Sequence, residues 1–172
     1  MANSTSASLK LTVQATGENS GTWGQITNTN LLILEQAIGG YDAFNVTNAS
    51  RALTFTNGAV SNGKNEVIKL TGTLAGNLNV TIPDSVEKTY TVENTCNHAG
   101  NTLTFKTTSG TGVLLCEGHS YNLWSDGTNV YKSSELKKWR AISSAETVQA
   151  GAQILVNTNG GAVTITLPAS PA

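Results

Sequence analysis

Charged residues are scarce in this chain of 172 residues. Asp, Glu, Lys and Arg make up 12% of the sequence, against roughly 25% in a typical globular domain. The apolar fraction is 38% and the formal net charge is -1, whereas disordered chains combine few apolar residues with a high net charge. Thr, Asn, Ser and Gly supply the polarity instead, and they favour short strands and tight turns. The composition therefore predicts a folded, β-rich chain.

The basic stripe with which nucleic-acid-binding domains displace counterions is also lacking. The pI is near 6.1, and the single basic cluster, Lys137, Lys138 and Arg140, is expected to be a solvated linker. No apolar run approaches the length of a membrane-spanning helix, and the first residues do not resemble a signal peptide. We expect no nucleic-acid partner and no membrane insertion.

Residue types that carry catalysis or hold metals are few. His98 and His119 stand beside turn-like residues, so a surface turn is expected for each rather than a catalytic base. Cys96 and Cys116 lack the close spacing of a zinc or redox motif, although they could face each other on neighbouring strands. The acidic residues show no glycosidase-like pairing, and no common catalytic motif is present. The sequence predicts no catalytic residue, no cofactor and no metal site.

One segment predicts a helix. Leu31, Leu34 and Ile38 fall at positions i, i+3 and i+7, which gives one apolar stripe. The Thr-Asn pair at residues 27–28 can cap its start, and Gly39-Gly40 can end it. A helix this short is marginal alone, so it has to dock on its own sheet or on a neighbouring subunit.

The rest of the chain has the pattern of strands and turns. Turn pairs such as Asn57-Gly58 and Asp126-Gly127 separate short alternating segments, which predicts an antiparallel β-sandwich or barrel-like domain. The fold class is therefore mainly β with one short N-terminal helix. Residues 135–140 are expected to form a helical turn or a linker. The predicted strands are 9–15, 44–48, 52–56, 66–71, 78–82, 89–93, 102–107, 121–124, 130–132, 154–156 and 163–167.

An internal repeat appears at an offset of 85 residues (155 − 70). Both copies contain a strand, a glycine turn, an alternating strand and a proline. The matched pairs are Leu70 and Leu155, Thr73 and Thr158, Gly76 and Gly161, Leu78 and Val163, Val80 and Ile165, Ile82 and Leu167, Pro83 and Pro168, and Ser85 and Ser170.

The second copy stops before the strands that follow in the first, which leaves an unpaired edge. We expect either a longer polypeptide, of which this is the N-terminal part, or pairing of the half-repeat with other subunits. The predicted organisation is an N-terminal segment with a strand, a Trp loop and a short helix (1–42), an antiparallel β-domain (43–134), and a linker with the first strands of a second, related β-repeat (135–172).

Three segments together resemble known proteins. Ser-Gly-Thr-Trp-Gly at residues 20–24, followed by Thr-Asn-Thr-Asn at 27–30 and the predicted helix, resembles the N-terminal segment of bacteriophage tail-fibre and related virion proteins. Residues 126–131 are similar to a hairpin ending of these proteins, and residues 162–168 to the opening of a fibre repeat. The resemblance implies a structural component of the virion, assembled in the host cytoplasm. It also implies a homotrimer that contacts other virion proteins near the tail or portal.

Two groups of residues are candidates for contacts. The first is expected to pack on another virion protein with Trp23 as its anchor, because Trp is favoured at interface centres. The alternative is that Trp23 closes its own loop onto the helix. The candidates of this group are Gly21, Thr22, Trp23, Gly24, Leu31, Leu34 and Ile38.

The second group is Tyr121, Trp124 and Tyr131, which could stack on a host surface glycan. The alternative is a cross-strand aromatic pair that stabilises a hairpin.

The function expected first is the particle-anchoring part of a tail fibre involved in host attachment. The alternatives are a tail-adaptor or capsid-surface protein, a carbohydrate-binding module, and, as the enzymatic alternative, a polysaccharide depolymerase.

Overall fold

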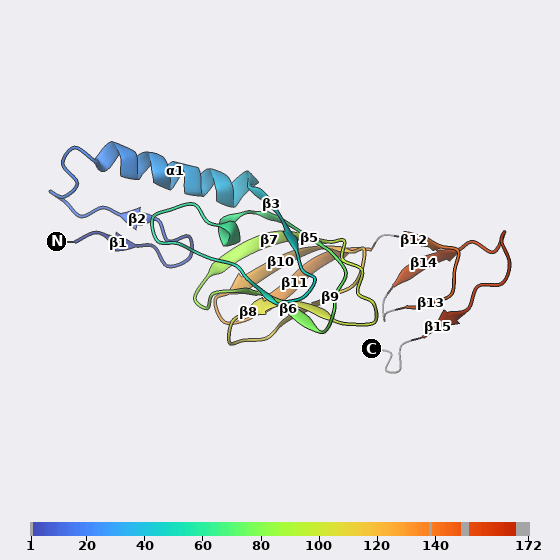
Figure 1. Cartoon of the computed structure of the whole chain (residues 1–172). Helices are drawn as coiled ribbons and strands as arrows, with labels where there is room; N and C mark the ends of the chain where they lie inside the picture. Colours follow the sequence, from blue (N-terminus) through green and yellow to red (C-terminus); the bar gives the residue numbers. More distant parts are fainter. Residues whose placement is uncertain (1, 138, 149–151, 168–172) are drawn as a thin grey trace.

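A computed structural model describes residues 2–137, 139–148 and 152–167, and its three parts lie in a row (Figure 1). The N-terminal part holds the short strands β1 (Ser4–Thr5) and β2 (Thr12–Val13) and the helix α1 (Trp23–Gly39). Residues 41–136, the first β-unit, contain β3 to β11, and residues 139–167, the second β-unit, contain β12 to β15. The prediction of a mainly β fold with one α-helix is confirmed for the described residues.

Two sheets enclose the core of the first β-unit. Their strand orders are β11-β10-β7-β5-β3 and β4-β6-β8-β9, and a 3-10 turn, η1 (Asn62–Lys64), precedes β5. The strands are β3 (Tyr41–Asn45), β4 (Arg51–Ala52), β5 (Val67–Thr71), β6 (Leu78–Ile82), β7 (Glu87–Asn94), β8 (Leu103–Thr107), β9 (Gly112–Leu115), β10 (Ser120–Asp126) and β11 (Val130–Leu136).

The chain coils between these sheets. Each pass adds one strand to each of the two sheets, and we call the two strands of one pass a rung. The rungs are β3 with β4, β5 with β6, and β7 with β8. Successive rungs are parallel, so that Val67 pairs with Tyr41 of the rung before and with Thr91 of the rung after. Antiparallel pairing occurs where β9 joins β8 and where β10 lies between β7 and β11.

The expectation of an antiparallel domain therefore holds only for the closing strands. Side chains alternate in the same way along parallel and antiparallel strands, so the sequence pattern does not distinguish them. Connections expected to be hairpins instead carry the chain to the other sheet, as residues 72–77 do between β5 and β6. The predicted hairpin at Asp126-Gly127 does join the antiparallel neighbours β10 and β11, with Gly127 at a φ of 84°.

Alternating residues of both sheets form one apolar core. The rings of Tyr90 and Phe105, from opposite sheets, lie 5.3 Å apart between centroids. Removing such side chains from water stabilises the fold by about 25 cal/mol for each Å² of apolar surface. The buried core residues include Phe44, Ile68, Leu70, Val80, Ile82, Val92, Leu103, Leu115, Tyr121, Leu123 and Val130.

Three local expectations are wrong. The helix begins at Trp23, before the expected cap, because Thr22 and Trp23 donate their amides to the carbonyl of Asn19 in a preceding turn. Of the expected strand at residues 9–15, the structure forms only β2. Residues 135–140 contain the end of β11 and the start of β12 rather than a helical turn, and residue 138 lies outside the described residues.

The second β-unit repeats the coil. Its strands β12 (Trp139–Ile142), β13 (Glu146–Thr147), β14 (Gln153–Val156) and β15 (Ile165–Thr166) form the parallel pairs β12·β14 and β13·β15. These pairs correspond to β3·β5 and β4·β6 of the first β-unit. Ile142 and Val148 are buried, so a small core is present between the strands.

Candidate functional site

Helix α1 is held to the rest of the molecule along one side. The Asn30 side chain bonds both backbone groups of Thr12: its Oδ1 accepts from the Thr12 amide at 2.9 Å, and its Nδ2 donates to the Thr12 carbonyl at 2.8 Å. Gln36 donates from Nε2 to Asn65 Oδ1 at 3.1 Å and accepts from the amide of Ser61 at 3.2 Å. Ile33 is fully buried on the same side. The Thr-Asn-Thr-Asn segment therefore fastens β2 to the helix.

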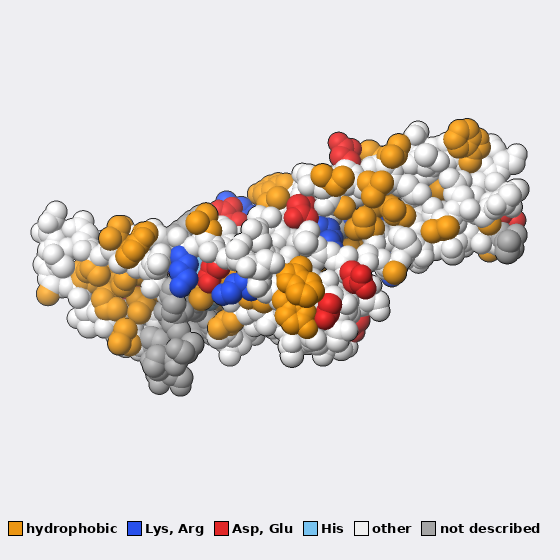
Figure 2. All heavy atoms as spheres, turned by 180° about the vertical axis from the view of Figure 1, so that it is seen from behind, with side chains coloured by type: hydrophobic (Ala, Val, Ile, Leu, Met, Phe, Trp, Pro, Cys, Tyr) orange, Lys and Arg blue, Asp and Glu red, His pale blue; other side chains and the backbone are white. Residues whose placement is uncertain are grey.

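A neighbouring face of α1 carries an apolar stripe that is exposed to solvent. Trp23, Leu31, Leu34 and Ile38, which we call the helix stripe, lie at positions i, i+8, i+11 and i+15 and so share one face. All four side chains are exposed, Trp23 at 64% and Ile38 at 78%. Figure 2 shows hydrophobic side chains on the surface of the half of the molecule that contains α1.

This exposure contradicts the alternative in which Trp23 closes its own loop onto the helix. Glu35 is the single charged residue of α1, so the stripe has almost no competing charge. Contiguous exposed apolar surface usually marks a site of interaction.

The remaining candidates of this group shape the turn before the helix. Gly21 has a φ of 80°, a conformation that glycine adopts without a steric penalty, and Thr22 is the N-cap residue. Gly24 lies in the first turn of α1, and a Cβ at that position would meet no atom within 4 Å. The structure thus places Trp23, Leu31, Leu34 and Ile38 on one face of α1. Gly21 and Thr22 instead shape the backbone of the turn that leads into the helix.

The aromatic candidates lie on opposite faces of the sheet that contains β10 and β11. Trp124 and Tyr131 are cross-strand partners whose rings stack with centroids 4.6 Å apart, and both are partly exposed. The hydroxyl of Tyr131 donates to Asp126 Oδ2 at 3.1 Å. Tyr121 is buried in the core, so its expected contact with a glycan is wrong. Residues 121 and 124 are an odd number apart on one strand, which places them on opposite faces.

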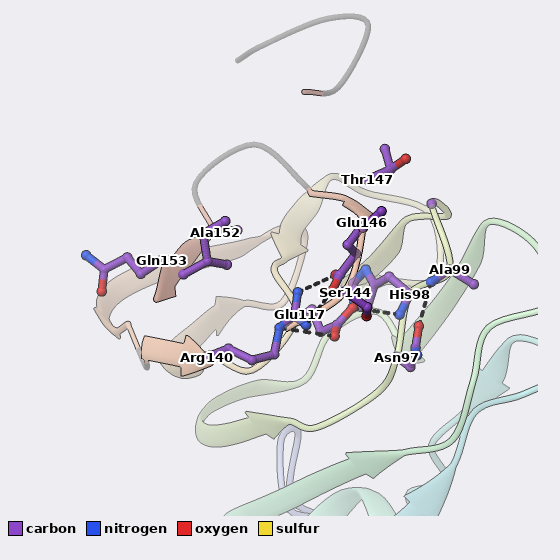
Figure 3. Close-up of a pocket in the computed structure, with 13 residues that line it drawn as sticks. Asn97, His98, Ala99, Glu117, Arg140, Ser144, Glu146, Thr147, Ala152 and Gln153 are labelled. Carbon is purple, nitrogen blue, oxygen red and sulfur yellow. Dashed lines mark hydrogen bonds and ion pairs between the residues drawn. The ribbon is translucent and has the colours of Figure 1, made fainter. Parts of the chain in front are cut away.

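A cavity of about 550 Å³ lies where the two β-units meet (Figure 3). Arg140 from β12 projects into it, and its Nη1 donates to Glu146 Oε2 at 2.8 Å while its Nη2 bonds Glu146 Oε1. Arg140 Nε is also 3.7 Å from Oε1 of Glu117 in the first β-unit. The hydrogen bonds from Arg140 hold the pKa of Glu146 below its usual value.

This arrangement links the two β-units. The carboxylates of Glu146 and Glu117 are both paired with the guanidinium of Arg140. The expectation of a solvated basic linker is wrong for Arg140, because the fold of the second β-unit places Glu146 beside it. Lys137 is exposed, and Lys138 lies outside the described residues.

The expectation that both histidines occupy surface turns is wrong, because each side chain folds inward and is buried. His98 Nε2 accepts from Asn94 Nδ2 at 2.8 Å, and burial lowers the pKa of His98. His119 Nδ1 lies 2.6 Å from Glu135 Oε1.

The donor atoms of Cys116, His119 and Glu135 lie within 4.8 Å of one another, and neither Cys96 nor Cys116 is in a disulfide. A thiol, an imidazole and a carboxylate are ligands that zinc accepts. However, tetrahedral ligands at zinc stand roughly 3.3 Å apart, whereas the His119 and Glu135 atoms are at hydrogen-bond distance. Lys132 Nζ also donates to the other Glu135 oxygen at 2.8 Å. His119, Glu135 and Lys132 therefore form a hydrogen-bond network that is partly buried.

Sequence reasoning missed this network, because its members become neighbours only when β10 and β11 pair. Burial alone raises the pKa of Glu135, but hydrogen bonds from Lys132, His119 and Tyr121 outweigh it and lower the pKa to about 2.

Within the described part of the chain, no helix combines the length and apolar character needed to cross a membrane. No protein-family model, no curated protein and no solved structure matches the chain.

Proposed function

We propose that this protein is a structural component of a bacteriophage virion, the N-terminal, particle-anchoring part of a tail fibre involved in host attachment. The observation that carries the proposal is the helix stripe. It lies in the segment whose sequence resembles phage virion proteins, and it exposes Trp23, Leu31, Leu34 and Ile38 on a helix that is fastened along the neighbouring face. The alternative is a tail-adaptor or capsid-surface subunit, which would use the same face.

The stripe suits protein contact for two reasons. A Trp side chain alone covers about 150–250 Å², and burying such anchors supplies most of the energy of many interfaces. The bonds of Asn30 and Gln36 hold the helix in place before any partner binds, so little ordering is needed on docking. The role that follows is structural rather than enzymatic.

The proposal is tested by Trp23→Ala in the virion. Loss of this anchor is expected to lower the copies of the protein per particle by at least about tenfold, since a buried Trp contributes more than the 1.4 kcal/mol that corresponds to a factor of ten. Quantitative immunoblotting of purified particles measures the copy number. The matched control is Trp139→Ala, which removes an equally exposed Trp from the second β-unit and is expected to leave incorporation unchanged. Normal copy number in both variants would exclude the helix stripe as the attachment surface.

A further inference from the structure

The two β-units share one repeat at the level of hydrogen bonding. In the first β-unit Arg51 pairs with Val80, and in the second Glu146 pairs with Ile165, the residue 85 positions after Val80. The next bond is also matched: Leu53 donates to the Thr81 carbonyl at 2.7 Å, and Val148 donates to the Thr166 carbonyl at 3.0 Å. Both units therefore begin with two equivalent rungs.

The first β-unit continues with a third rung that covers the second one. β7 pairs with the free edge of β5, and β8 pairs with the free edge of β6, both in parallel. In the second β-unit, the described residues place β14 beside β12 alone and β15 beside β13 alone. The edges of β14 and β15 correspond to those that β7 and β8 cover.

The difference in pairing appears in the exposure of equivalent side chains. Leu70 and Ile82 are fully buried in the first β-unit, whereas their counterparts Leu155 and Leu167 are 57% and 74% exposed. Hydrophobic side chains accordingly gather over the second β-unit, at the left end of Figure 2. Such an open, apolar sheet edge readily pairs with a further strand.

We infer that the edges of β14 and β15 are the docking site of a third rung, supplied by a polypeptide segment that follows Leu167 as β7 and β8 follow Ile82. The sequence repeat supports this order, because Pro83 directly follows β6 and Pro168 stands 85 residues later in the sequence. The segment is expected to carry alternating apolar residues like Tyr90 and Val92 in the strand that pairs with β14. The inference rests on strand geometry and not on the proposed function.

A second copy of the chain fits these edges less well. A two-fold axis would pair β14 with its own counterpart in antiparallel orientation. Every equivalent edge in the first β-unit takes a parallel strand instead.

The test extends the full chain after Leu167 with a duplicate of residues 83–107, which replaces residues 168–172 and restores proline at position 168. Hydrogen exchange is then measured for the amides of β14 and β15. The expected result is at least about tenfold slower exchange than in the unextended chain, since these amides gain partners. A second extension, in which Val replaces the duplicated Tyr90, Leu103 and Phe105 and the duplicated Val92 is kept, guards against a poor fit of the large side chains.

The matched control carries Ser at those four duplicated positions and is expected to leave exchange unchanged. Equal exchange in the unextended chain and in both apolar extensions would overturn the inference. Slower exchange in the unextended chain as its concentration rises would also overturn it, in favour of a second copy. None of these outcomes depends on incorporation into a virion, so the test is separate from that of Trp23.

Discussion

Glu135 shows how one largely buried carboxylate stabilises the junction between β10 and β11. Its pKa of about 2 lies below the ordinary value of 4.5, so its stabilising effect is present above pH 4.5 and is lost as the pH falls toward 2. Glu135→Gln is expected to lower stability at pH 7 and to flatten the loss of stability between pH 4.5 and 2. Urea denaturation across this range measures both effects, with the exposed Glu35→Gln as the control. An unchanged acid profile would contradict the network.

Lys64 is a second buried charge and holds the loop between β4 and η1. Its Nζ donates to the carbonyls of Thr56 at 2.7 Å and Ala59 at 2.5 Å, and burial lowers its pKa. Lys64→Ala is expected to cost about 2–4 kcal/mol of unfolding free energy, because it leaves a cavity and two carbonyls without donors. Lys64→Met keeps most of the volume and should cost about 1–3 kcal/mol. Chemical denaturation compares the two, and a loss below about 0.5 kcal/mol in both would refute this role.

At the scale of elements, the side chain of Asn30 binds β2 to α1 by accepting from the Thr12 amide and donating to the Thr12 carbonyl. Asn30→Ala is expected to release residues 4–13 from α1 and to speed amide exchange there, while the first β-unit keeps its protection. The cost should be about 1–2 kcal/mol of local stability. Asn28→Ala, an exposed Asn on the same helix, serves as the control in hydrogen-exchange mass spectrometry. Unchanged exchange in residues 4–13 would mean that other contacts hold β2.

At the scale of the whole molecule, the expectation is a homotrimer. The resemblance of residues 20–30 to tail-fibre proteins implies this threefold state. The mass in solution should be three times 17.9 kDa. Sedimentation equilibrium at micromolar concentration decides this, and a monomeric mass for the unmodified chain would count against the trimer.

Only part of the candidate site was accessible from the sequence. The spacing of Leu31, Leu34 and Ile38 predicts one helix face, but Ile33 and Leu32 are also apolar, so the spacing does not say which face docks internally. That depends on Asn30 and Gln36 meeting Thr12 and Asn65, which are distant in sequence. Strand parity alone, in contrast, predicts that Tyr121 and Trp124 lie on opposite faces of the sheet, so that both could not stack on one glycan.

The sequence by itself determined the features that depend on neighbouring residues. The alternation of apolar residues, the helical spacing, the turn at Asp126-Gly127 and the offset repeat are local patterns, and each has a counterpart in the structure. Tertiary structure alone decided whether strands pair in parallel, which helix face stays exposed, and that Cys116, His119 and Glu135 meet. The physical reason is that the direction of strand pairing and the burial of a face depend on contacts between segments that are distant in the sequence. Such contacts produce no periodic pattern in the sequence.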